Sequence, residues 1–171
     1  MLELVKQNFE SGGYNFSNVH EQICLKTVYD TIPNTYIIPK GNNTVNNIAM
    51  INKLVKGKNL LYQNAGLNIK TPKGNNRTIE ILLYLFKSKT SIYIDAKYLS
   101  QYSETYTYFA LNDFPQVARI KGTLFVYVLF GEGFTPDLIN LIEQRKKQVQ
   151  GNNIVILKND IELKNFLLSF I

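Results

Sequence analysis

Apolar and polar positions alternate most regularly in the stretch RTIEILLYLFKSKTSIYIDAKY, which begins at Arg77. Two runs rich in β-branched and aromatic residues, 79–86 and 91–98, flank the polar linker 87–90. Such runs suit pleated strands and such a linker suits a turn, so the pattern predicts an antiparallel hairpin.

The two faces of this hairpin differ in polarity, which determines how its charged residues are arranged. If Phe86 pairs with Ser91, one face is wholly apolar and must be buried. That face comprises Ile79, Ile81, Leu83, Leu85, Ile92, Ile94, Ala96 and Tyr98. The other face sets Glu80 opposite Lys97, with Asp95 beside them on the second strand. A slip of one residue would break up the apolar face, so the hydrophobic pattern keeps these charged side chains together.

Strand-like and helical patterns also alternate along the rest of the chain. We expect strands over 35–39, 123–130 and 153–157. We expect helices over 1–10, 18–30, 46–58, 107–120, 136–150 and 160–171. The run 60–69 fits either a strand or a helix end, and Pro115 moves the expected start of its helix to about residue 112. This order predicts a single α/β domain, 1–171, with a mixed sheet, a central hairpin and helices on both faces.

Capping residues mark where three of these helices are expected to begin. Asn18, followed three residues later by Glu21, makes a capping box. Thr135 precedes Pro136, which is the preferred order of an N-cap and a first helical residue. Asp160 is expected to cap the last helix of the chain.

The composition is that of a folded protein with one core. With 171 residues, of which 45% are hydrophobic and 12% aromatic, the chain can bury a substantial interior. No apolar run approaches the roughly 18–20 residues of a membrane span. The N-terminal stretch MLELVKQNFESGG lacks the apolar segment of a secretory signal. The single cysteine, Cys24, suits a reducing compartment, so we expect a cytoplasmic protein that does not associate with membranes.

Several classes of chemistry are excluded by residues that the chain lacks. His20 is the only histidine, which argues against a Ser-His-Asp or Cys-His hydrolase. The sequence has no Cys/His cluster for structural zinc and no Gly-rich loop of the P-loop or dinucleotide-binding type. The formal net charge of +6 favours a polyanionic partner such as nucleic acid, although many basic proteins bind none.

The charged cluster of the hairpin has a structural and a functional interpretation. As a cross-strand ion pair on a solvated face, Glu80 and Lys97 would contribute only about 0.2–1 kcal/mol. However, Leu82, Tyr84 and Tyr93 share that face, so we expect it to be largely covered, with its polar groups gathered at one end. Charges at the mouth of a covered sheet are typical of a functional site.

An acidic residue on one strand and Asp-X-Lys on the next, here Glu80 and Asp95-Ala96-Lys97, resembles the motif of the PD-(D/E)XK nuclease superfamily. This superfamily includes many restriction endonucleases. Its first acid is usually Asp, often after Pro, whereas Thr78-Ile79 precedes Glu80. The expected order of elements after residue 18 is also similar to the common core of the superfamily, so the resemblance implies a restriction endonuclease-like fold.

The resemblance implies a Mg²⁺-dependent endonuclease that hydrolyses phosphodiester bonds of DNA. For a small single domain, it implies a type II restriction endonuclease that acts as a homodimer. Glu80 and Asp95 would be the metal ligands, and Lys97 would orient the nucleophile or stabilise charge in the transition state. Glu21, on the helix before the hairpin, is a candidate for a further metal ligand, although the capping box explains it equally well.

Candidate contacts to nucleic acid lie on either side of the hairpin. Lys70, Lys73 and Arg77 belong to the basic segment KTPKGNNR that leads into it, and such side chains contact phosphates. Tyr102 belongs to the tyrosine-rich connection that follows, and an aromatic ring there can stack on a nucleotide. A solvated turn and a tyrosine that caps the core are the alternative interpretations.

Other functions remain open on the same residues. A junction resolvase, a repair or phage nuclease and a nuclease toxin fit the motif equally well. A noncatalytic nucleic-acid-binding module or interaction subunit would use the Glu80–Asp95–Lys97 cluster as a structural salt bridge. An α/β protein that binds neither metal nor nucleic acid would show no salt-dependent affinity for DNA.

Overall fold

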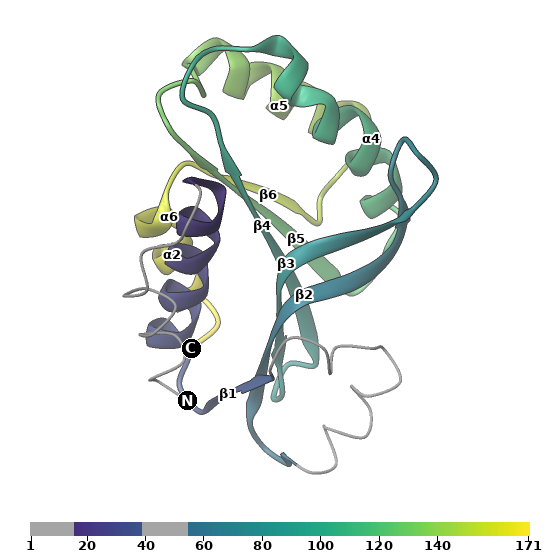
Figure 1. The fold of residues 1–171 in the computed structure, drawn as a ribbon. Coiled ribbons are helices and arrows are strands. Elements are labelled where there is room, and N and C mark those ends of the chain that lie inside the picture. Colours follow the sequence, from purple (N-terminus) through teal and green to yellow (C-terminus); the bar gives the residue numbers. More distant parts are fainter. Residues whose placement is uncertain (1–15, 39–54) are drawn as a thin grey trace.

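The structure, a computed structural model, describes residues 16–38 and 55–171. Within these ranges, six strands form one sheet in the order β1-β2-β3-β4-β5-β6 (Figure 1). The strands are β1 Thr35–Ile38, β2 Asn59–Lys70, β3 Asn76–Leu85, β4 Thr90–Tyr98, β5 Thr123–Phe130 and β6 Ile154–Leu157. The helices are α2 Phe16–Thr31, α4 Tyr108–Val117, α5 Pro136–Gln148 and α6 Asp160–Leu168, with the 3₁₀ turn η1 Glu104–Thr107 before α4. The β2–β3 and β3–β4 pairs are antiparallel and the others parallel, so the predicted mixed sheet is confirmed.

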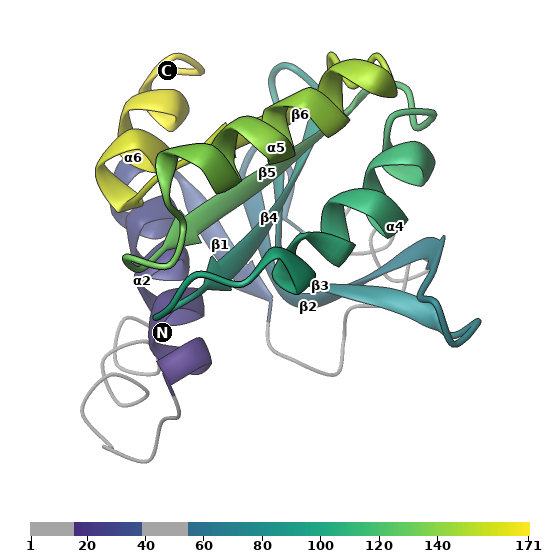
Figure 2. The same cartoon turned by 90° about the horizontal axis from the view of Figure 1, so that it is seen from above.

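Helices cover both faces of the sheet, which confirms the predicted α/β arrangement (Figure 2). On one face α2 and α6 pack through residues such as Val28 and Leu163 against Val126 of β5. On the other face α4 and α5 pack through residues such as Phe114 and Ile142. In the described part of the chain, no helix combines the length and apolar character that a membrane span requires.

Strand β5 lies between two parallel partners, because its sequence TLFVYVLF presents apolar side chains to both faces. Its last six residues are all buried, as predicted for a strand covered by helices on both sides. The connections from β4 to β5 and from β5 to β6 run through α4 and α5, which share one face. Right-handed crossovers that advance in one direction across a sheet place their helices on the same side.

Helices α2 and α4 both begin earlier than the sequence predicts. Because α2 starts before Asn18, that residue cannot be the N-cap, and the predicted capping box is wrong. Gly13 is the last chain breaker before this helix, so nothing in the sequence delays its start. Pro115 lies inside α4 rather than in its first turn. The helix continues past this proline because Phe114 and Val117 are both fully buried.

The two C-terminal helices begin close to the predicted positions. Thr135 caps α5 as predicted, and its hydroxyl accepts a hydrogen bond from the backbone N–H of Leu138 at 3.4 Å. Helix α6 is capped by Asn159 rather than by Asp160, because the Asn159 side chain accepts the Glu162 N–H at 2.9 Å. Asp160 is instead the first helical residue, where its negative charge suits the helix dipole.

Between α2 and the hairpin, only some of the predicted helices and strands can be compared with the structure. The expected strand 35–39 is confirmed as β1. The expected helix 1–10 and positions 46–54 of the helix 46–58 lie outside the described residues, while 55–57 form a turn. The run 60–69 belongs to β2, whose pairing with β1 and β3 on either side resolves the ambiguity in favour of a strand.

The register of the β3–β4 hairpin differs from the prediction by two residues. The structure pairs Tyr84 with Ser91 and Leu82 with Tyr93, whereas the prediction pairs Phe86 with Ser91. The turn closes one residue earlier on both strands, at Lys89, whose φ of +53° lies in the left-handed region. A shift of two residues leaves each side chain on its predicted face, so the polar cluster survives the error.

One residue of the predicted apolar face, Ile79, packs on the other side of the sheet. Pairing between β3 and β4 ends at Ile81, and nearer the N-terminus β3 pairs with β2 alone. Opposite Glu80 the β2–β3 pairing skips Asn64, which has a left-handed φ of +50°. Ile79 packs with the cluster on the α4 side, and Figure 1 shows the β2–β3 arm projecting from the sheet.

Gly131 follows β5 directly and lies against the backbone after β4. Its φ is +96°, and a Cβ there would lie 3.0 Å from the Leu99 carbonyl carbon and closer still to the oxygen. We expect Gly131→Ala to lower the free energy of unfolding by more than about 2 kcal/mol, because the left-handed backbone and the clash both oppose the methyl group.

The matched control is Gly122→Ala, since Gly122 also has a left-handed φ, +72°, but nothing lies within 4 Å of its Cβ position. We expect this control to lower the free energy of unfolding by roughly 1–2 kcal/mol, the cost of placing a Cβ on a left-handed backbone. Urea unfolding of both variants measures the difference, and equal losses would contradict the proposed clash.

Candidate active site

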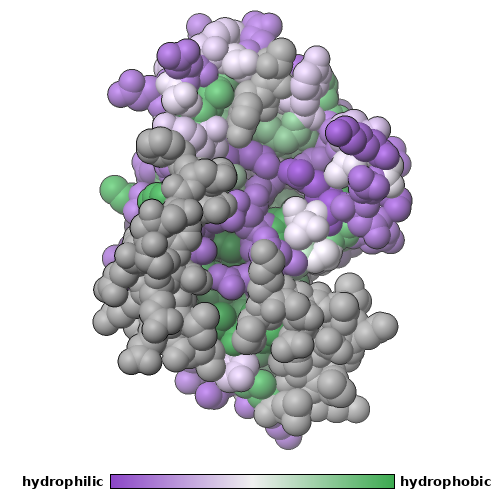
Figure 3. All heavy atoms as spheres, in the orientation of Figure 1, coloured by the Kyte–Doolittle hydropathy of each residue, from purple (hydrophilic) through white to green (hydrophobic). Residues whose placement is uncertain are grey.

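The charged residues predicted from the sequence meet at the point where β3 separates from β4. Because the pairing of the two strands ends at Ile81 and Ile94, the next residues, Glu80 and Asp95, flank the opening. Asp95 is only 2% exposed, which is unusual for an aspartate and requires compensation by nearby groups. Figure 3 shows a hollow lined by hydrophilic residues between the α4–α5 side of the molecule and the β2–β3 arm.

Two cations compensate the buried Asp95 carboxylate. Lys97 Nζ lies 2.8 Å from Asp95 Oδ2, and Arg77 Nη2 lies 3.3 Å from the same oxygen. Arg77 Nε also lies 3.2 Å from Oδ2 of Asp113, a second buried aspartate on α4. Arg77 therefore joins the hairpin arm, the central strand β4 and helix α4 in a single ionic network.

Glu80 is the third carboxyl group of the site, and its burial beside Asp95 raises its pKa and so favours the protonated form. Burial and then the negative charge of Asp95 raise the pKa of Glu80 to about 10, and its carboxyl group hydrogen-bonds to Asp95. The two cations already balance the two buried aspartates, so an ionised Glu80 would add an uncompensated charge. Although burial raises the pKa of Asp95, the charge of Lys97 and the hydrogen bond from Glu80 hold it below its usual value.

Lys97 keeps its positive charge although it is largely buried. Burial lowers its pKa, but the negative charge of Asp95 raises it further, so the net pKa lies above the usual value for lysine. The ammonium group also lies 5.5 Å from the centre of the Phe109 ring, a cation–π distance. Phe109 stacks on Tyr127 with 5.3 Å between ring centres, so an aromatic pair fixes the position of Lys97.

The carboxyl oxygens of this site fit a hard metal ion. Glu80 Oε2 and Asp95 Oδ1 are both buried, and within the described residues no donor outside this pair of carboxyl groups satisfies them. Buried polar oxygens are normally satisfied, and a divalent cation such as Mg²⁺ binds carboxylate oxygens of this kind. A metal charge of +2 would also offset the ionisation of Glu80. Glu80 and Asp95 are therefore the residues that could hold Mg²⁺.

Glu21, the third predicted metal ligand, is not gathered with them. It lies on α2, and no group of three or more His, Cys, Asp or Glu side chains that could hold a metal occurs in residues 16–38 and 55–171. Mg²⁺ usually retains several waters and uses one or two protein carboxylates, so Glu80 and Asp95 suffice chemically.

The basic segment between β2 and β3 is tied down by helix α4. Gln116 forms two hydrogen bonds with the main chain of Lys70: its Oε1 accepts the N–H at 2.8 Å and its Nε2 donates to the carbonyl at 2.9 Å. Asn112 Nδ2 donates to the same carbonyl at 3.1 Å. Lys70 and Lys73 are exposed, as expected of residues that contact phosphates. Their segment is thus held next to the ionic network.

Three of the predicted nucleic-acid contacts have side-chain partners within the protein. Lys70 Nζ donates to Asn76 Oδ1 at 2.7 Å. Arg77 is committed to the two aspartates, although its side chain keeps 26% of its surface exposed. Tyr102 is 53% exposed and its hydroxyl donates to Glu104 at 2.9 Å. It is not among the residues that line the cavity described below.

Asp113, Asn112, Gln116 and Phe109 shape the site but were missed by the sequence analysis. All of them lie on α4, and the contacts of Asn112 and Gln116 with Lys70 span 42 and 46 residues. No short sequence motif predicts contacts between residues that far apart in the chain. The one available signal was Asp113 itself, a carboxylate in a helix whose neighbour Phe114 is strongly apolar.

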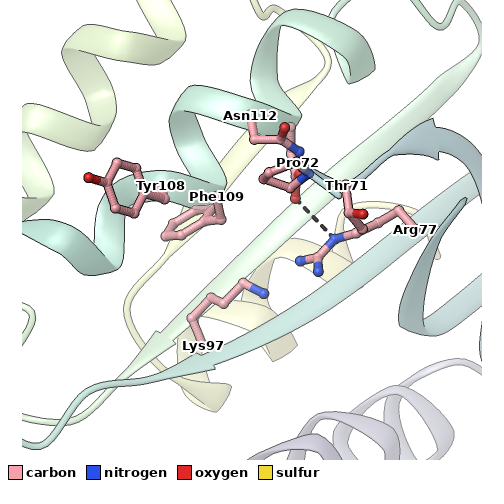
Figure 4. Close-up of a pocket in the computed structure, with 8 residues that line it drawn as sticks. Thr71, Pro72, Arg77, Lys97, Tyr108, Phe109 and Asn112 are labelled. Carbon is pink, nitrogen blue, oxygen red and sulfur yellow. Dashed lines mark hydrogen bonds and ion pairs between the residues drawn. The ribbon is translucent and has the colours of Figure 1, made fainter. Parts of the chain in front are cut away.

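A cavity of about 300 Å³ opens beside Lys97 and Arg77 (Figure 4). Its lining consists of Thr71, Pro72, Arg77, Lys97, Tyr108, Phe109, Asn112 and Asp113. Figure 4 shows the charged groups of Arg77 and Lys97 pointing into the space below the helix that carries Phe109 and Asn112. The cavity therefore joins the ionic network to the surface.

Comparison of the chain with protein-family models, with curated proteins and with solved structures found no match. What this site can do is therefore inferred from its own geometry and charge.

Proposed function

We propose that the protein is a Mg²⁺-dependent endonuclease that hydrolyses phosphodiester bonds of DNA. The observation that carries the proposal is the meeting of Glu80, Asp95 and Lys97 where two strands part. On each acid one buried carboxyl oxygen finds no donor outside the pair among residues 16–38 and 55–171. Buried carboxyl oxygens are normally paired, and a divalent cation would satisfy both of these.

Each residue has a distinct role in this proposal. Asp95 and Glu80 would hold Mg²⁺, which when bound activates a water and neutralises charge on the phosphate. Lys97, protonated and fixed above Phe109, holds a positive charge within reach of a phosphate that approaches Asp95. Arg77 adds a second cation at the entrance, and its pairs with Asp95 and Asp113 keep it oriented there.

The architecture supports the same class of protein. The mixed sheet, the hairpin that carries both acids and the helices on both faces resemble the PD-(D/E)XK core, so we propose a restriction endonuclease-like fold. Within that class we propose a type II restriction endonuclease that acts as a homodimer in the cytoplasm. A junction resolvase and a repair, phage or toxin nuclease use the same chemistry, and the pattern of cleavage separates them.

A noncatalytic nucleic-acid-binding module or interaction subunit is the second candidate. The feature that favours it is the ionic network itself, since Lys97 and Arg77 already compensate Asp95 without a metal ion. Metal dependence separates the candidates, because a binding module retains DNA and leaves it intact with or without Mg²⁺.

The test is cleavage of plasmid and phage DNA in Mg²⁺, with EDTA and the variants Asp95→Asn and Lys97→Met alongside. We expect cleavage to stop in EDTA and to slow by at least roughly 100-fold in each variant, because each removes charge from the reacting centre. Asp30→Asn is the control, because Asp30 forms an exposed pair with Lys26 on α2.

The products also identify the kind of nuclease. Discrete fragments indicate a sequence-specific enzyme of the restriction type, and a smear indicates a nonspecific or structure-directed one. Intact DNA in every lane, with wild type and variants bound to it equally, would refute the nuclease proposal and support the binding module.

A further inference from the structure

The cavity beside Lys97 is divided into a charged inner part and an apolar rim. Lys97 and Arg77 form the inner part, with 13% and 26% of their side chains exposed. Pro72 and Tyr108 form the exposed rim. An anionic group at the inner end and a flat apolar group at the rim would match this arrangement.

The inner cations retain hydrogen-bonding capacity that the ionic network does not use. A guanidinium group carries five N–H donors and an ammonium group carries three. Arg77 directs Nη2 to Asp95 and Nε to Asp113, and Lys97 directs Nζ to Asp95. Among the residues that the structure describes, the remaining donors of both side chains have no ion-pair partner, so they can bind phosphate oxygens within the cavity.

The aromatic ring at the rim, that of Tyr108, is exposed and is not part of the hydrophobic core. Tyr108, the first residue of α4, is 63% exposed, whereas Phe109 beside it packs on Phe114 and Tyr127. An exposed tyrosine that lines the same cavity as two cations can stack on a nucleobase while the cations hold its phosphate.

The size of the cavity restricts the ligand to something no larger than a single nucleotide. A volume of about 300 Å³ lies at the lower limit of small-molecule sites, which leaves no room for a stacked base pair. A free phosphate would leave the rim unused, and an acidic peptide has no flat ring for Tyr108.

We propose that this cavity binds one nucleotide that has left the base stack, with its base against Tyr108 and Pro72 and its phosphate at Arg77 and Lys97. The inference rests on the proposed nuclease function and narrows its substrate to strands that contain an unpaired or extruded nucleotide. Extrusion is easiest at a mismatch or in a single strand, so such substrates bind more tightly than a matched duplex.

The test is equilibrium binding of fluorescein-labelled oligonucleotides in EDTA, measured by anisotropy, so that cleavage does not interfere. We expect wild type to bind a single strand and a duplex with one central mismatch roughly tenfold more tightly than the matched duplex. Tyr108→Ala should weaken binding of the mismatched duplex by about 5- to 100-fold, the effect of losing one stacked base.

Two further variants separate stacking from other effects. Tyr108→Phe retains the ring and should rescue the affinity that Tyr108→Ala loses. Leu111→Ala removes another exposed apolar side chain from α4, outside the cavity, and should bind like wild type. Equal affinity of wild type for matched and mismatched duplexes, together with unchanged binding by Tyr108→Ala, would overturn the proposal.

Cleavage of the same oligonucleotides in Mg²⁺ keeps this inference distinct from the proposed function. If the mismatch preference holds in EDTA but no oligonucleotide is cut, the cavity stands as a nucleotide site and the nuclease proposal fails. If every duplex is cut equally and Tyr108→Ala cuts like wild type, the nuclease proposal stands and the cavity inference fails.

Discussion

Replacing Asp95 by Ala is expected to lower the free energy of unfolding by about 3–5 kcal/mol, the usual cost of removing one partner from a buried ion pair. The loss is large because Lys97 and Arg77 both direct a charged nitrogen to Asp95 Oδ2, at 2.8 and 3.3 Å. Without the carboxylate, the two cations would face each other in a site that water barely reaches. Urea unfolding at neutral pH measures the loss.

Two controls isolate the buried charge from the loss of a side chain. Asp30→Ala breaks an exposed ion pair with Lys26 and should cost less than about 1 kcal/mol. The double variant Asp95→Leu/Lys97→Met removes both charges and should recover much of the stability, since apolar replacement of a whole buried pair is often neutral. If Asp95→Ala costs no more than Asp30→Ala, the network does not stabilise the fold as described.

Replacing Glu80 by Gln is expected to stabilise the metal-free protein and to abolish cleavage. The ordinary pKa of Glu is about 4.3, and burial next to Asp95 raises the pKa of Glu80 to about 10 in the folded protein. Between these values the folded protein keeps a proton that the unfolded chain has lost, so wild-type stability falls as the pH rises. Gln is neutral at every pH and its amide can donate to Asp95, so the variant lacks this loss.

The measurement is urea unfolding of both proteins in EDTA from pH 4 to pH 9. The two curves should nearly coincide at the acidic end and separate steadily above about pH 5, with Glu80→Gln the more stable. Glu143→Gln is the control, because Glu143 forms a partly exposed pair with Lys146. Parallel pH profiles for wild type and Glu80→Gln would show that Glu80 is not protonated in the fold.

Both expected results arise because several ionisable side chains, including Asp95 and Glu80, are gathered in a buried site. A protein selected for stability alone would replace a protonated buried glutamate with an amide or an apolar residue. A carboxyl group that raises the cost of folding is typical of a site where function requires it. The opposite effects expected for Asp95→Ala and Glu80→Gln therefore test the structural and functional parts of the site separately.

Local patterns in the sequence determined most of the secondary structure and the part of the site that lies on the hairpin. The alternation around Glu80 and Asp95 predicted a hairpin with both acids on one face, because side chains repeat every two residues along a strand. The strand β5 and the N-cap Thr135 could also be predicted from the sequence, since each depends on a few neighbouring residues. Such features require no knowledge of distant parts of the chain.

Only the tertiary structure decided the register of the hairpin, the bend of the β2–β3 arm and the cavity. The register depends on where the turn closes, and a shift of two residues preserves every face, so the hydrophobic pattern cannot detect it. Arg77 reaches Asp113 because the β2–β3 arm lies beside α4, where Gln116 holds the main chain of the arm. These contacts depend on how separate elements pack, because residues far apart in sequence meet only when the sheet and its helices assemble.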